Sequence, residues 1–193
     1  LSGWFYRDTF TGTNGLIAKR SGFAIGDVGY IAYIDATTDQ LIFQVSDGTD
    51  TYTITSNTTF TAVGWHHFAV VWDQDSAANS EIYIDGVADR ATDTGTIGNV
   101  GDLSNAFGVY IGARSDGSAL FDGRIDEARL NKRALSAAEI KSLYDQGSAD
   151  SVNSSASQNQ GTGRLDSALV LYYALDDGTS GATPTSATDS GPN

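Results

Sequence analysis

Residues 64–73 read Gly-Trp-His-His-Phe-Ala-Val-Val-Trp-Asp, and this stretch decides the fold of the chain. Aromatic and β-branched residues dominate it, which favours an extended strand. Three further stretches follow in order: EIYIDG at 81–86, FDGRIDEARL at 121–130 and RALSAAEI at 133–140. The Asp-Gly pair at 85–86 favours the positive backbone angles of a tight hairpin turn. The order predicts a strand, a hairpin, another strand and then a helix.

The rest of the chain is also strand-like. Short runs rich in β-branched and aromatic residues occur at 30–34, 41–45 and 52–55. Further Asp-Gly turn signals lie at 47–48, 116–117, 122–123 and 177–178. Many short strands with Gly/Asp turns predict an all-β fold, an antiparallel β-sandwich of jelly-roll type.

One segment is helical instead. Ser136 and Glu139 form a capping box, in which each side chain satisfies a backbone N–H of the other residue. Apolar residues then recur at helical spacing: Ala137, Ile140, Leu143 and Tyr144. Gly147 stands where a helix commonly stops. We expect one short amphipathic helix over residues 137–146, packed against the sandwich.

Composition excludes several classes of partner and site. The net charge is −13, with 24 acidic against 11 basic residues, so the chain repels a phosphate backbone and no nucleic acid partner is expected. No cysteine is present, which excludes a disulfide framework and a zinc–thiolate site. No apolar run approaches the ~18–20 residues of a membrane span. An acidic surface suits a protein secreted into salty water, and solubility alone is the alternative explanation.

The stretches GWHHFAVVWD, IYIDG and GRIDEARLNKRALSAAEIKSLYDQG resemble the laminin-G-like branch of the concanavalin A-like lectin/glucanase superfamily. The resemblance covers roughly residues 1–147. It implies a jelly roll with one helix on the C-terminal side. It also implies an extracellular or cell-surface location.

The chain departs from that family in the position of one strand. Family members begin with a strand similar to LVLYYALDDG and a loop similar to DSGPN, but here both lie within residues 169–193. The resemblance implies a tandem array, with a domain at 1–147, a Ser/Asn/Gly-rich linker at 148–165 and the start of a following repeat at 166–193. Three placements of the last segment stay open: completion of its own sandwich, insertion into a neighbouring chain, or an incomplete second domain.

Catalysis is not expected. Catalytic members of the superfamily carry Glu-x-Asp-x-x-Glu on one strand, and this chain has only three glutamates: Glu81, Glu127 and Glu139. Asp126 and Glu127 are adjacent on a strand, so we expect their side chains to face opposite ways. His66 and His67 are adjacent too, so we expect only one of them to face inward.

Calcium is the predicted metal. The resemblance implies an ion held between the last strand and the displaced loop, with Asp126, Asp189 and Asn193 as ligands. An ion pair of Asp126 with Arg124 or Arg129 is the alternative. A ligand rim is predicted in the loop at 114–122, at these residues: Arg114, Asp116 and Asp122. Plain turn hydrogen bonding is the alternative for the two rim aspartates.

Two functions remain open. The first is a non-catalytic extracellular adhesive or structural module of a tandem-repeat surface protein, assembling by strand complementation into a homo-oligomer or head-to-tail polymer. The alternative is a calcium-dependent carbohydrate-binding module attached to a glycan-active enzyme, with a glycan or surface polymer as partner. A groove lined by exposed aromatic and polar residues favours sugar binding. Buried aromatic residues and open strand edges favour assembly.

Overall fold

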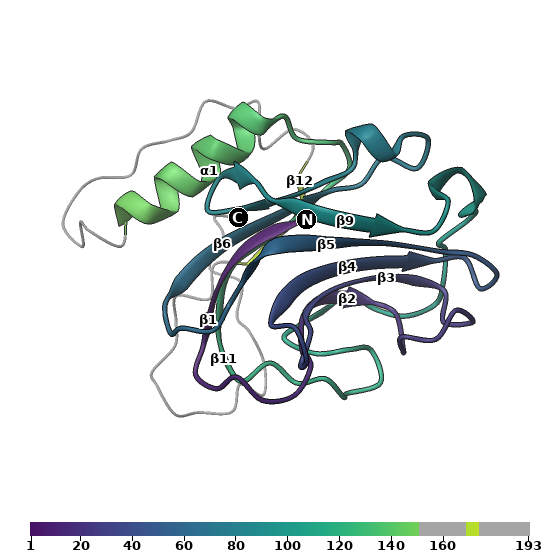
Figure 1. Cartoon of the computed structure of the whole chain (residues 1–193), viewed down its shortest axis with the longest axis horizontal. Coiled ribbons are helices and arrows are strands. Elements are labelled where there is room, and N and C mark those ends of the chain that lie inside the picture. Colours follow the sequence, from purple (N-terminus) through teal and green to yellow (C-terminus); the bar gives the residue numbers. More distant parts are fainter. Residues whose placement is uncertain (151–168, 174–193) are drawn as a thin grey trace, which may run out of the picture.

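The computed structural model describes residues 1–150 and 169–173, with side chains for residues 1–148. Within these residues two antiparallel sheets of six strands each pack face to face, and one α-helix lies outside them (Figure 1). The prediction of an all-β jelly-roll sandwich with one helix is confirmed. No described helix is long and apolar enough to cross a membrane.

We call the two sheets A and B. Sheet A has the strand order β12-β11-β1-β6-β7-β8, and sheet B the order β10-β2-β3-β4-β5-β9. The strands of sheet A are β1 (Ser2–Arg7), β6 (Trp65–Val71), β7 (Glu81–Ile84), β8 (Val87–Ala88), β11 (Gly123–Asn131) and β12 (Leu169–Tyr173). Those of sheet B are β2 (Asn14–Lys19), β3 (Gly29–Ile34), β4 (Gln40–Ser46), β5 (Thr51–Thr59), β9 (Arg90–Thr94) and β10 (Tyr110–Ile111). Two short 3₁₀ turns lie at Ala77–Asn79 and Ile97–Asn99.

The main core lies between the sheets. Phe5 and Phe68 of sheet A and Phe43 of sheet B are almost fully buried there, together with Leu41 and Ile54. Alternate residues of each strand supply this face, as the period of two in a pleated strand requires. Each fully buried side chain of this size contributes about 1.5–3 kcal/mol, so the core holds the two sheets in a fixed relation.

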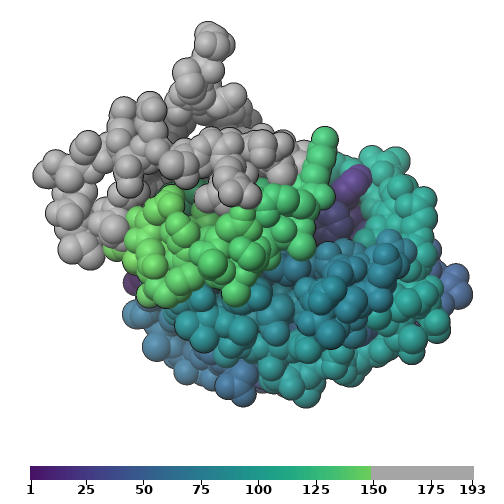
Figure 2. Space-filling view, turned by 90° about the horizontal axis from the view of Figure 1, so that it is seen from above, coloured from purple at the N-terminus to yellow at the C-terminus, as the bar shows by residue number. Residues whose placement is uncertain are grey.

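A smaller core lies on the outer face of sheet A, beneath α1 (Ala137–Asp150). Ile140 and Leu143 are buried, and Ile140 packs on Ala69 and Val71 of β6. Figure 2 shows α1, in green, lying on the outside of the molecule against this layer. Sheet A is therefore covered on both faces over part of its width.

The start of α1 follows the sequence prediction. The Glu139 N–H donates to Ser136 Oγ at 3.3 Å, and the Ser136 N–H donates to Glu139 Oε2 at 2.8 Å. The predicted end is wrong, because α1 runs past Gly147 to Asp150 and takes in the first residues of the predicted linker.

The strand β12 lies at the edge of its own sheet. It pairs antiparallel with β11, with Arg129 opposite Tyr172 and Leu130 opposite Leu171. This pairing within one chain is the arrangement expected if the segment completes its own sandwich, and the choice among the three placements stays a prediction. The rest of the predicted linker and following repeat, residues 151–168 and 174–193, lies outside the described residues.

Candidate functional site

Strand register brings aromatic and acidic side chains together on the outer face of sheet A. Residues directly opposite each other on paired strands project from the same face. Trp4 of β1 stands opposite His67 of β6 and Asp126 of β11. Two residues along β1, Tyr6 stands opposite the pair Trp65 and Arg124. Two parallel rows of side chains thus cross the middle of the sheet.

A cleft of about 450 Å³ opens between these rows and α1. We call it the α1 cleft. The described residues that line it are Trp4, Trp65, Asp85, Asp126, Glu127, Tyr144, Gly147 and Ser148. The cleft therefore combines three aromatic side chains with three carboxylates. Its volume falls within the roughly 300–1,000 Å³ of small-molecule sites.

A β-bulge places both acidic residues of β11 in the cleft. Trp4 pairs with Asp126 and Ser2 with Arg129, so Glu127 and Ala128 together lie opposite Gly3 alone. Glu127 takes up the extra residue with a φ of 48°. The expectation that the side chains of Asp126 and Glu127 face opposite ways is therefore wrong. It assumed a regular strand, whereas the bulge shifts the alternation by one residue.

The three cleft carboxylates are held by the protein. Glu127 Oε2 forms an ion pair with Arg129 Nη1 at 2.8 Å. Asp126 Oδ1 accepts the backbone N–H of Glu127 at 2.7 Å. Asp85, in the turn between β7 and β8, accepts the His67 N–H at 2.8 Å and lies 3.0 Å from His66 Nδ1. These contacts fix the carboxylates before any ligand binds, which lowers the entropy cost of recognition.

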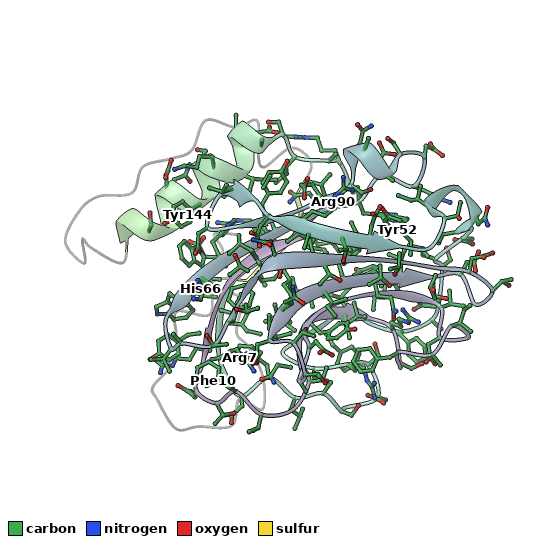
Figure 3. All side chains as sticks on the ribbon, viewed as in Figure 1. Arg7, Phe10, Tyr52, His66, Arg90 and Tyr144 are labelled. Atoms are coloured by element: carbon green, nitrogen blue, oxygen red, sulfur yellow. The ribbon has the colours of Figure 1, made fainter. Side chains whose placement is uncertain are left out.

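The aromatic residues of the cleft form two ring pairs that differ in their exposure to solvent. Tyr144 projects from α1 toward sheet A (Figure 3) and stacks on Trp4, with ring centroids 5.6 Å apart and planes at 21°. Trp4 is only 8% exposed, whereas Trp65 is 40% exposed. Tyr6 packs edge-on against Trp65 at 5.8 Å. Part of the Trp65 ring is thus available for contact with a ligand.

Gly147 explains how α1 approaches so closely. A Cβ atom at this position would lie 2.3 Å from Nε1 of Trp4, so only glycine lets the helix lie against the indole. The close contact also covers the indole N–H, which has no hydrogen-bond partner among the described residues. The close approach of α1 to sheet A, and with it the shape of the cleft, depends on this glycine.

His67 is the buried member of the histidine pair, as the alternation predicts. It lies between sheet A and α1 rather than between the sheets, with its ring 5.3 Å from that of Trp4. Neither ring nitrogen has a partner among the described residues. Burial, with a smaller effect of Arg129, lowers the pKa of His67 to about 4. The ring is therefore neutral at neutral pH.

The predicted calcium ligands are only partly within the described chain. Asp126 lines the α1 cleft, while Asp189 and Asn193 lie outside the described residues. Within residues 1–150, no group of three or more Asp, Glu or His side chains could hold a metal ion. These residues alone therefore do not form a calcium cage, and calcium binding stays a prediction.

The predicted ligand rim is a closed turn. Arg114 Nη2 binds Asp116 Oδ2 at 2.8 Å, and Asp116 Oδ1 accepts the N–H of Ser118 at 2.9 Å. These contacts, that of Arg114 first, hold the pKa of Asp116 well below its usual range. Asp122 accepts the hydroxyl of Thr9 at 2.8 Å. A ligand role for Arg114, Asp116 and Asp122 stays a prediction.

Residues 1–141 match the laminin-G model of the concanavalin A-like lectin/glucanases superfamily. The chain belongs to this superfamily. No curated protein matches it in sequence. Among solved structures, this superfamily member is similar to the CBM40 of the IT-sialidase from Ruminococcus gnavus. The TM-score is 0.51 at 14% identity, over 74% of this chain and 80% of that one, which shows a shared fold.

Sequence reasoning missed most of the α1 cleft. Trp65, Asp85 and Tyr144 come from three separate segments, and only the strand pairing brings them together. A signal was nevertheless present, because Trp4 and Tyr6 alternate on β1 as Trp65 and His67 do on β6. Such alternation on adjacent strands places aromatic side chains on one face.

Proposed function

We propose that the chain is a non-catalytic carbohydrate-binding module whose ligand lies in the α1 cleft. The observation that carries the proposal is the juxtaposition of Trp65 and Tyr144 with the carboxylates of Asp85 and Asp126 in one cleft. Aromatic rings present flat apolar faces to the C–H faces of sugar rings, and carboxylates accept hydrogen bonds from sugar hydroxyl groups. Lectin-like folds are typically non-catalytic, which supports the same conclusion.

Two further findings support carbohydrate binding. The similar solved structure is a carbohydrate-binding module by its name, and laminin-G-like domains are usually extracellular, where glycans are abundant. The ion pair of Glu127 with Arg129 at 2.8 Å supports the non-catalytic part of the proposal, because an ion-paired carboxylate suits a fixed hydrogen-bond acceptor better than a proton donor. We infer an extracellular location and a free or cell-surface glycan as partner.

The exposed ring at the mouth of the cleft gives a direct test. Trp65→Ala is expected to weaken glycan binding about tenfold, since an aromatic contact contributes about 0.5–1.5 kcal/mol beyond the area it buries. A glycan array screened with the full chain identifies the ligand, and calorimetry then measures the dissociation constant. Tyr110→Ala is a matched control, because Tyr110 on β10 is also 40% exposed but lies on sheet B. Equal affinities for the two variants would argue against the cleft.

A calcium ion held in part by Asp126 is a more specific version of this proposal. Asp126 supplies a carboxylate oxygen in the cleft, and the remaining ligands are predicted in residues 189–193. Calcium at 100 times its dissociation constant is expected to add about 2.7 kcal/mol of stability and raise the Tm by roughly 5–10 °C. Differential scanning fluorimetry with and without CaCl₂ measures the shift, and Asp126→Asn is expected to abolish it. A shift of equal size in the variant would place calcium elsewhere.

The pairing of β12 with β11 favours a second candidate function, that of an adhesive or structural module assembled by strand complementation. The segment 169–173 occupies an edge of sheet A and is separated from α1 in the sequence by residues 151–168, so an equivalent strand of another copy fits the same edge. In a tandem-repeat surface protein this exchange would link neighbouring modules. The mass of the full chain in solution tests the idea, because a monomer at all concentrations contradicts exchange between free chains.

A further inference from the structure

The charge of the α1 cleft is one-sided. Three of its eight described lining residues are acidic, and none of the eight is a lysine or an arginine. Arg129 lies behind Glu127 as its ion-pair partner and offsets one negative charge. Two other cations lie near the cleft, and each has an acidic partner: Arg124 of β11 pairs with Asp8 at 3.1 Å and lies over the ring of Tyr6, and Lys141 of α1 pairs with Asp145 and lies over the ring of Tyr144. In the absence of a bound cation, a ligand in the cleft therefore meets a negative potential.

The cleft sets these carboxylates beside aromatic rings. Trp65 is 40% exposed, and Tyr144 stacks on Trp4 with ring centroids 5.6 Å apart. The indole N–H of Trp4 is covered by Gly147 of α1 and is not open to a ligand. The site thus offers several hydrogen-bond acceptors for hydroxyl groups and apolar ring surface for the C–H face of a sugar.

This combination fits a neutral polyhydroxylated ring. Hydroxyl groups donate to the carboxylates of Asp85, Asp126 and Glu127, while the apolar face of the sugar ring packs against Trp65. A carboxylate on the ligand would instead face fixed like charges at short range in a partly desolvated site, which is unfavourable. The net charge of −13 on the whole chain adds a long-range repulsion at low salt.

We propose that the α1 cleft selects uncharged pyranose units and rejects acidic sugars such as uronic and sialic acids. The proposal rests on carbohydrate binding in this cleft and names its ligand class. It also assigns the discrimination to particular groups, of which Asp126 is the carboxylate opposite Trp4 across the β1–β11 pair.

The test uses the full chain, with and without added calcium, and pairs of glycans in which the neutral member is the methyl ester of the acidic one. Oligogalacturonate and its methyl ester form one pair, and sialyllactose and its methyl ester form another; neutral cello-, manno- and galacto-oligosaccharides complete the panel. At 20 mM NaCl the neutral member of each pair is expected to bind about tenfold more tightly than the acidic member. This difference in affinity is expected to become smaller at about 500 mM NaCl, where charge is screened. An acidic member that binds as tightly as its neutral partner would overturn the selectivity.

Variants connect the selectivity to the cleft. Asp126→Asn is expected to reduce the gap between neutral and acidic glycans several-fold. Asp102→Asn is the matched control, because Asp102 is distant in the loop before β10 and its removal changes the net charge of the chain equally. If both variants narrow the gap equally, the discrimination comes from overall charge and the proposal fails. If no glycan of either kind binds, carbohydrate binding itself is wrong.

Discussion

Removal of residues 151–193 is expected to produce a chain that is less stable and that self-associates. The truncation leaves the backbone of β11 unpaired along the residues that β12 covers, Ala128 to Asn131. Four residue pairs are lost, and at about 1 kcal/mol for each net hydrogen bond the cost is on the order of 2–4 kcal/mol. An open, regular edge is also a template for pairing with another chain.

Urea unfolding and light scattering measure the two effects. A chain ending at residue 173 is the matched control, because it keeps β12 and loses only the segment after it. This control is expected to behave like the full chain. A peptide covering residues 166–175, added to the truncated chain, is expected to restore a monomer of normal stability. A truncated chain that is monomeric and fully stable would mean that β12 contributes nothing to the sandwich.

Acidification is expected to weaken the packing of α1 through His67. The folded-state pKa of His67 is about 4 against an ordinary value of 6.5, so the unfolded chain binds the proton more readily. The contribution of neutral His67 to the free energy of unfolding is complete above pH 6.5 and is lost as the pH falls toward 4. A difference of about 2.5 pKa units corresponds to about 3 kcal/mol. The groups that act on His67 are Arg129, which lowers its pKa, and Asp85, which raises it.

His67→Phe separates this effect from other acid-sensitive groups. Phenylalanine keeps an aromatic ring beside Trp4 but carries no titratable nitrogen, so the loss of stability between pH 7 and pH 4 is expected to shrink by about 3 kcal/mol. His66→Phe is the control and is expected to keep the full loss. Urea titrations at several pH values give the comparison. An identical pH dependence in His67→Phe and the native chain would remove His67 as the cause.

The sequence was sufficient for the sandwich and the helix start because those signals are local. The Asp85-Gly86 pair predicts its turn, and the structure gives Asp85 a φ of 50° and Gly86 a φ of 78° there. The Ser136–Glu139 box likewise needs only residues three positions apart. Both predictions depend on neighbours along the chain, so tertiary structure had little opportunity to override them.

The cleft could not be predicted because non-local contacts decide it. Glu127 adopts a positive φ without a glycine to indicate it, so the bulge that reverses the alternation of β11 leaves no local signal. Gly147 is a stop signal by local rules, yet α1 continues to Asp150, and the missing side chain at 147 instead makes room for the indole of Trp4, far away in the sequence. In both cases the relevant contact is with β1, a distant segment.

The pairing of β1 with β11 has a kinetic consequence. Ser2 stands opposite Arg129, so the middle of sheet A closes only when segments near the two ends of the described sandwich meet. Contacts of such long sequence separation carry a large loop-closure entropy before they gain any burial, and folds dominated by them fold in roughly milliseconds to seconds. During synthesis, β1 can pair with β6 but lacks its other neighbour until β11 has emerged. The edge of β1 that β11 covers is open to other chains throughout that interval.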